Sequence, residues 1–251
     1  MADLNQDLYM IIFKVIEVFV YLFCAITIYR KKRGYILNRT YFIALSGWVV
    51  YILLDAILFP IGHIELFSFG YISVNSGLAT IPMIANILRD IAVAAGGVLA
   101  FGFLYASIII RFGEARAKEK RTLLIMLGGY FLLVIPTIIF DQIIKEINLN
   151  PVTVHTQFNI PSAIMILAQI IVYFIGVYEL FVIYRKISDK NEKRRILFFI
   201  LGVIIIAIGV LFFVIIGLVN LEGSAFITGP IGHIIWILAP IFILIGIKRT
   251  E

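Results

Sequence analysis

Seven apolar segments, each about 20 residues or longer, constrain this chain more than any other feature. A run of that length can cross the hydrocarbon core of a bilayer as a helix. In lipid a helix satisfies all of its own backbone hydrogen bonds. We therefore predict an all-α polytopic membrane protein in which residues 1–251 form a single seven-helix transmembrane domain. The predicted spans are Leu8–Tyr29, Tyr41–Phe59, Ile81–Ile110, Thr122–Ile144, Pro161–Tyr184, Ile196–Val219 and Ala225–Ile247.

The composition supports this class, because 62% of the residues are hydrophobic and only 14% are charged. Soluble domains average about 45–50% apolar and about 25% charged residues. The basic residues are unevenly placed: 18 of the 21 Lys and Arg follow the first, third, fifth and seventh spans. Such residues mark the cytoplasmic side. We expect an outside amino terminus, a cytoplasmic carboxyl terminus, a multi-pass location in the cell membrane and no nucleic-acid partner.

The third span is the one most expected to carry function. Arg89 and Asp90 lie roughly 12 Å inside it at 1.5 Å per residue, where a charge is costly unless it is paired or faces a cavity. Ala92, Gly96 and Ala100 follow at a spacing of four, which lets neighbouring helices approach closely. We interpret this span as the central helix of the bundle.

Polar residues within five spans fall roughly 6–15 Å below the predicted outer boundary, and Glu179, in the inner half, is the exception. Two readings follow. These residues either form salt bridges that fix helix packing or line a polar pocket, open to the outside, that binds a ligand or ion. The shared depth favours the pocket, since pairing alone needs matched depth only within each pair. The predicted ligand-binding residues are Lys14, Glu17, Asp55, Asn86, Arg89, Asp90, Gln169 and His233.

Depth also suggests partners within this set. Glu17 and Asp55 lie at a suitable depth for Arg89, and Lys14 at a suitable depth for Asp90. We expect Arg89 to contact one of those two carboxylates beside a cavity that Gln169 or His233 also lines.

Motifs for metal, cofactor or catalytic chemistry are not evident in the sequence. His63, His155 and His233 fall on one predicted side, with Glu65 nearby, but their spacing matches no metal motif. The seventh span lacks the deep lysine that a retinal Schiff base needs. We expect no metal, no cofactor and no catalytic residue, which makes an enzyme the weaker reading.

A faint internal repeat is visible at an offset of 155 residues. Ile28-Tyr-Arg-Lys31 recurs as Ile183-Tyr-Arg-Lys186, and Gly47 matches Gly202. The alternative is that inner helix ends generally attract aromatic and basic residues. If the repeat is real, residues 8–112 and 161–247 are parallel copies joined by the helix at 122–144. That plan resembles the sugar transporters called SWEETs, although spans one and five lack their Pro-Gln pair.

The first three spans carry a second resemblance. A basic turn at Arg30–Arg33 leads to a Trp-bearing span, Tyr41-Phe-Ile-Ala-Leu-Ser-Gly-Trp48, and Leu88-Arg89 opens a span rich in small and aromatic residues. This pattern resembles the seven-helix sensory region of prokaryotic histidine kinases. The resemblance implies a sensor, and without a kinase domain its signal would pass to a separate cytoplasmic partner.

These observations lead to one main functional hypothesis and two alternatives. The main hypothesis is a stand-alone, receptor-like membrane sensor that binds a small, unidentified ligand in the outer-half pocket. The first alternative is a small-solute or ion transporter of three-plus-one-plus-three plan. The second is a structural subunit with a membrane-complex partner.

Overall fold

The computed structural model describes residues 2–62, 80–140, 147–149, 152–154, 160–219 and 225–247, with side chains at 10–57, 87–139, 164–216 and 228–247. In this part of the chain seven helices are long and apolar enough to cross a membrane, which confirms the predicted all-α class and multi-pass character. The helices are α1 (Ala2–Lys31), α2 (Ile36–Gly62), α4 (Thr80–Ala117), α5 (Lys120–Phe140), α6 (Ile160–Lys186), α7 (Lys190–Val219) and α8 (Ala225–Ile247).

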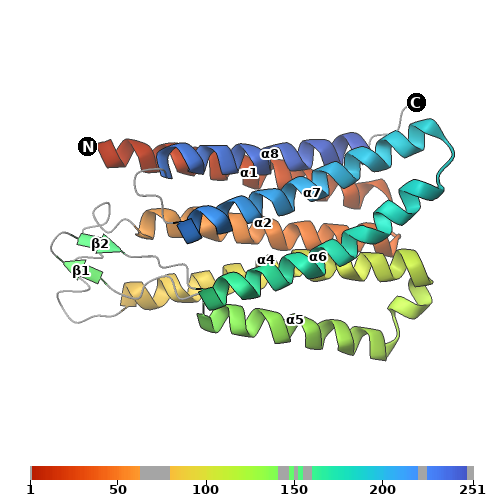
Figure 1. Ribbon diagram of the computed structural model, residues 1–251, viewed down its shortest axis with the longest axis horizontal. Helices are drawn as coiled ribbons and strands as arrows, with labels where there is room; N and C mark the ends of the chain where they lie inside the picture. Colours follow the sequence, from red (N-terminus) through yellow and green to blue (C-terminus); the bar gives the residue numbers. More distant parts are fainter. Residues whose placement is uncertain are drawn as a thin grey trace.

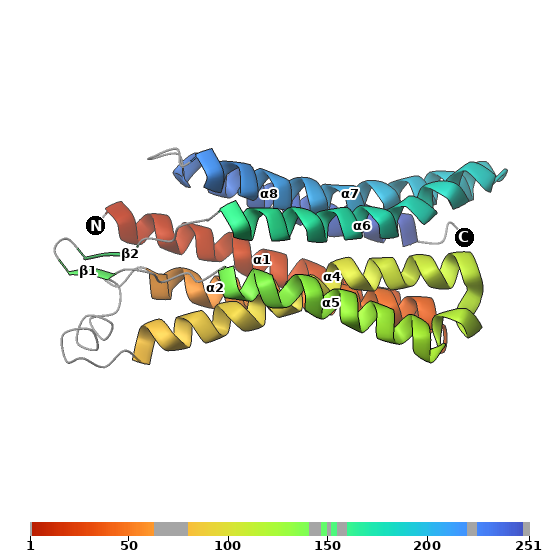
Figure 2. The same ribbon diagram turned by 60° about the horizontal axis from the view of Figure 1, so that its bottom comes forward.

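Six of these helices form a closed ring, and α5 lies outside it (Figure 1). Around the ring, α1 packs on α2, α2 on α4, α4 on α6, α6 on α7, α7 on α8, and α8 returns to α1. Among these contacts helix α5 packs only against α4 and α6; it forms the lower edge of the bundle in Figure 1 and comes to the front in Figure 2. The α4 span has the largest buried share, 50%, and the α5 span has 11%. The third predicted span is therefore the most enclosed helix.

The turns that carry most basic residues all lie at one end of the bundle, which we call the basic end (Figure 1). Several helices extend beyond the predicted spans there, because hydropathy marks only the part in lipid. Helix α7 begins six residues before Ile196, where Asp189 Oδ1 accepts a hydrogen bond of 2.7 Å from the Glu192 backbone N–H. An aspartate in that position satisfies a free N–H at the helix start.

Helix α4 continues seven residues past the predicted Ile110 and breaks its helical geometry once, at Gly113. Gly113 has φ of +84°, a conformation that glycine adopts without steric cost. The break lies beside Arg111, so it re-aims the last turn of α4 just where the helix leaves the apolar region.

A short hairpin was not predicted. Strands β1 (Ile147–Leu149) and β2 (Val152–Val154) pair antiparallel, with Leu149 opposite Val152. Alternating apolar residues around Asn150-Pro151, both common turn formers, were the signal available in the sequence. The hairpin lies at the end of the bundle opposite the basic end (Figure 1).

Glycines allow close helix crossings within the ring. A Cβ on Gly47 of α2 would lie 2.6 Å from the Ala95 carbonyl oxygen of α4, and one on Gly202 of α7 would lie 2.6 Å from the Ala239 carbonyl oxygen of α8. Helix backbones can approach this closely only where a side chain is missing. The α2–α4 and α7–α8 crossings therefore both depend on a glycine, and the two glycines lie 155 residues apart, on α2 and α7.

Candidate functional site

Three of the predicted polar residues meet in one ion-pair cluster between α1, α2 and α4. Lys14 Nζ contacts Asp55 Oδ2, and Arg89 Nη1 lies 3.9 Å from Asp55 Oδ1. All three side chains are mostly enclosed, with exposed fractions of 6%, 27% and 13% for Lys14, Asp55 and Arg89. The expected contact between Arg89 and a carboxylate is therefore present, with Asp55 as the partner. Asp55 sits between two cations and holds α1 and α4 to α2.

A second pair joins α1 to α8. His233 Nδ1 lies 2.8 Å from Glu17 Oε1, and the side chains are 2% and 0% exposed. The Phe13 ring stacks on the imidazole, with ring centroids 6.4 Å apart. Glu17 lies one turn along α1 from Lys14, so this pair and the ion-pair cluster occupy adjacent turns of one helix face.

The other predicted site residues are placed less directly. Lys14 contacts Asp55, and the expected contact between Lys14 and Asp90 stays a prediction. Asp90 is half-buried. Gln169 belongs to a different contact, since its Nε2 donates to Thr137 Oγ1 at 2.9 Å. The Asn86 side chain lies outside the described residues, as do His63, His155 and Glu65.

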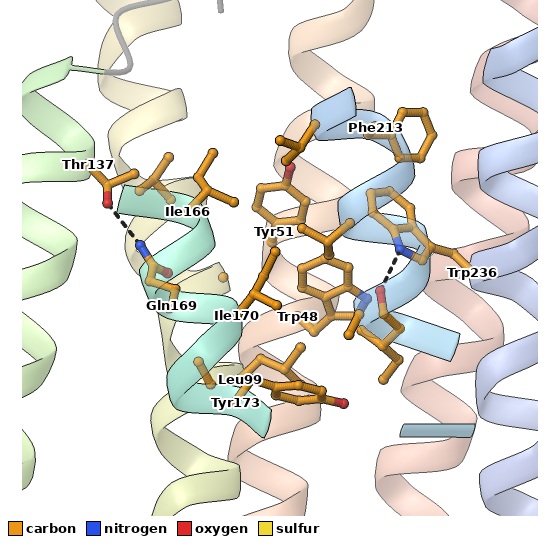
Figure 3. A pocket seen from close by; sticks show the side chains of 18 of the residues that line it. Trp48, Tyr51, Leu99, Thr137, Ile166, Gln169, Ile170, Tyr173, Phe213 and Trp236 are labelled. Carbon is orange, nitrogen blue, oxygen red and sulfur yellow. Dashed lines mark hydrogen bonds between the residues drawn. The ribbon is translucent and has the colours of Figure 1, made fainter. Parts of the chain in front are cut away.

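Next to the ion-pair cluster, a cavity of about 150 Å³ lies between the two halves of the ring. It touches α2, α4, α6, α7 and α8, together with Thr137 of α5 (Figure 3). Of the predicted residues, Arg89 and Gln169 line it, whereas Lys14, Glu17, Asp55 and His233 are not among its lining residues. The cavity is more apolar than the predicted polar pocket. Its aromatic lining residues are Trp48, Tyr51, Tyr173, Phe213 and Trp236.

These aromatic side chains form a continuous wall. Trp48 stacks on Tyr51 with ring centroids 4.8 Å apart, and it meets Trp236 edge-on at 5.2 Å. Phe213 packs against Trp236 at 4.6 Å. At one end of the wall, the Arg89 guanidinium lies over the Tyr51 ring at 5.8 Å, within the range of a cation–π interaction.

Hydrogen bonds to neighbouring backbones hold the wall in place. Trp236 Nε1 donates to the Ile206 carbonyl oxygen at 3.3 Å (Figure 3), and the Tyr173 hydroxyl donates to the Val203 carbonyl oxygen at 2.7 Å. On the other side of the view in Figure 3, Gln169 bonds to Thr137. The wall is thus fixed to α7 from two sides, as suits a preformed cavity.

The aromatic wall was missed at the sequence level. One signal was available: Trp in a membrane helix normally lies near a membrane interface, whereas Trp48 and Trp236 lie near the middles of the spans Ile36–Ile57 and Thr228–Ile247. A Trp far from the interface needs a partner for its N–H, and Ile206 supplies one for Trp236.

Toward the basic end, packed aromatic rings close the bundle. Phe103 lies 5.1 Å from Tyr41 and 4.9 Å from Tyr173, and Tyr41 lies 5.3 Å from Phe199, all between ring centroids. Glu179, the one polar residue expected in the inner half, is paired there with Arg111 at 2.9 Å.

Among the described residues, no group of His, Cys, Asp or Glu is placed to hold a metal ion. No protein-family model, curated protein or solved structure matches the chain. The structure therefore shows seven apolar helices, and the similarity to the sensory regions of histidine kinases stays a prediction.

Proposed function

We propose that this protein is a receptor-like membrane sensor that binds a small, mostly apolar molecule with an acidic or hydrogen-bond-accepting group. The cavity between α2, α4, α6, α7 and α8 carries this proposal. An apolar protein cavity of about 150 Å³ holds a molecule the size of benzene. Aromatic walls with few polar groups are typical of small-molecule sites.

Arg89 and Gln169 give the cavity its chemical preference. The guanidinium is a planar fork of N–H donors that matches a carboxylate, and Lys cannot reproduce that geometry. Gln169 faces the same space from α6, with its Nε2 held by Thr137. A ligand in this position contacts helices from both halves of the ring, so its binding favours one arrangement of the halves over another.

The test uses purified protein in lipid nanodiscs, with benzoate and neutral benzyl alcohol as probes. Val210→Phe fills the cavity, while Val50→Phe makes the same change on a lipid-facing position that is 40% exposed. We expect a benzoate-dependent rise in melting temperature that Val210→Phe abolishes and Val50→Phe retains. Equal stabilisation of both variants would show that the probe acts through the lipid and would refute the site.

Arg89→Lys tests the acidic preference. This substitution keeps a cation near Asp55 but removes the planar set of guanidinium N–H donors. A hydrogen bond to a charged group contributes about 1.5–3 kcal/mol, which is roughly a 10- to 100-fold change in affinity. We expect weaker benzoate binding and unchanged benzyl alcohol binding. If both probes lose affinity equally, Arg89 does not select the acidic group.

A second candidate is a small-solute transporter built from two parallel three-helix repeats. Neighbour relations favour it: exchanging α1, α2 and α4 with α6, α7 and α8 leaves the ring contacts unchanged. Each of the two glycine crossings has a second close contact: Gly102 of α4 meets Ala44 of α2, and Gly246 of α8 meets Phe199 of α7. Transporters with parallel repeats place their substrate at the repeat interface.

Flux separates the two candidates. A transporter would carry the solute that binds into liposomes, and Val210→Phe would block that uptake. The sensor proposal predicts binding without flux, in keeping with the aromatic packing of Tyr41, Phe103 and Phe199 toward the basic end.

A further inference from the structure

Glu17 and His233 form a buried ionisable pair that the ligand cavity does not use. We infer that this pair is a proton-binding site and that its occupancy is transmitted to the aromatic wall through Trp236. The inference does not depend on whether the cavity takes a ligand.

The geometry leaves a place for one additional proton. One proton lies in the 2.8 Å contact between His233 Nδ1 and Glu17 Oε1. Either the ring N–H donates it to the carboxylate, or a protonated carboxyl group donates it to the ring nitrogen. Within the described residues, Glu17 Oε2 is buried and has no hydrogen-bond partner. Binding takes one proton from water, onto either the carboxyl group or the second ring nitrogen, and breaks no bond between heavy atoms.

The surrounding charges favour a single added proton. The groups facing the pair are Lys14 and Tyr21 from α1 and Asp55 from α2, while α7 presents the Phe213 ring; Arg89 of α4 lies behind Asp55, 3.9 Å from its Oδ1. Among the described side chains at this predicted depth, Lys14 and Arg89 stand against the three carboxylates Glu17, Asp55 and Asp90, a sum of −1 when His233 is neutral. One proton brings this layer to zero, and an uncompensated charge is costly in a membrane interior.

A short path joins the pair to the cavity. His233 and Trp236 lie one turn apart on α8, with ring centroids 5.9 Å apart. Phe213 touches both, at 5.4 Å from His233 and 4.6 Å from Trp236. Trp236 lines the cavity and meets Trp48. A change of charge or ring orientation at His233 therefore acts directly on two side chains of the aromatic wall.

The chain has only three histidines and two tryptophans, which permits a direct test. In a His63→Gln/His155→Gln variant, His233 is the sole histidine, and nuclear magnetic resonance of ring-labelled histidine in nanodiscs reports its protonation. We expect one single-proton transition between about pH 4 and about pH 9. Glu17→Gln, close in shape to the parent, should move its midpoint by more than about one pH unit. No transition in that range, or the same midpoint with Glu17→Gln, would overturn the proton site.

Fluorescence tests the transmission. In a Trp48→Phe variant Trp236 is the only tryptophan, and its emission should change with pH at the midpoint found for His233. Glu17→Gln should move that emission midpoint by the same amount, while His63→Gln/His155→Gln should leave it in place. Emission that is flat across the His233 transition would overturn the link to the cavity wall. Neither experiment uses a ligand, so failure here is distinct from failure of the proposed binding function.

Discussion

At the scale of single residues, Asp55 is the charge on which the ion-pair cluster depends. Its two carboxylate oxygens face Lys14 on one helix and Arg89 on another. Removing Asp55 leaves two enclosed cations without this partner, whereas removing Arg89 leaves the Lys14–Asp55 pair in place. The cost of each substitution should therefore differ strongly within one cluster.

We predict that Asp55→Asn lowers the free energy of unfolding by about 3–5 kcal/mol, the range for breaking a buried ion pair. Adding Lys14→Gln should recover part of this loss. Chemical unfolding in detergent measures both. Glu119→Gln is the control: it removes the exposed Arg116–Glu119 pair at 2.7 Å, and such pairs contribute about 0–1 kcal/mol. Equal effects of Asp55→Asn and Glu119→Gln would contradict the role of the cluster.

Depth along the sequence predicted which ionisable residues gather in one layer, but it did not predict every pair. Arg89 was expected near Glu17 or Asp55, and the structure shows Asp55. Depth alone could not choose between these two carboxylates, because it says nothing about the direction a residue faces around its helix, and the expected contact between Lys14 and Asp90 stays a prediction. The aromatic wall escaped notice because the mid-span positions of Trp48 and Trp236 mark them as unusual without separating packing from cavity lining.

At the scale of helices, hydropathy predicted the seven spans well because lipid accepts only long apolar helices. It did not predict the continuation of α4 to Ala117 or of α7 back to Lys190, where capping and surface ion pairs stabilise helix in water. The order of helices around the ring also needed the structure, since chain order placed α5 between α4 and α6 without showing that it lies outside them.

The glycine crossings give the prediction at this scale. Gly47→Ala and Gly202→Ala each place a methyl group 2.6 Å from a backbone oxygen that cannot move away by rotating a side chain. We expect each to lower the free energy of unfolding by about 1–3 kcal/mol, the usual cost of overpacking. Gly128→Ala is the matched control, because nothing lies within 4 Å of its Cβ. Alanine is the better helix former, so this change should be neutral or slightly stabilising.

At the scale of the whole molecule, the placement of basic residues predicts orientation. We expect the basic end to face the cytoplasm and the amino terminus to lie outside. Cys24, the single cysteine, is buried and can be replaced by alanine to give a cysteine-free background. In intact cells an impermeant thiol reagent should label Ser76→Cys and spare Lys118→Cys, a position at the basic end with 61% side-chain exposure. The reverse labelling pattern would invert the orientation and place the ion-pair cluster nearer the cytoplasm.

The position of α5 outside the ring suits the proposed plan of two parallel three-helix repeats. Three crossings carry a chain from one side of a membrane to the other, so a second unit joined directly would run upside down. One extra crossing returns the chain to its starting side, and that crossing needs no place in the ring. Apart from the residues that pack on the ring, among them Gly129, Tyr130, Leu133, Val134 and Thr137, α5 should accept almost any lipid-compatible sequence. Saturation mutagenesis with an expression readout should show that α5 tolerates more substitutions than any other helix, because its crossing of the membrane matters more than its side chains.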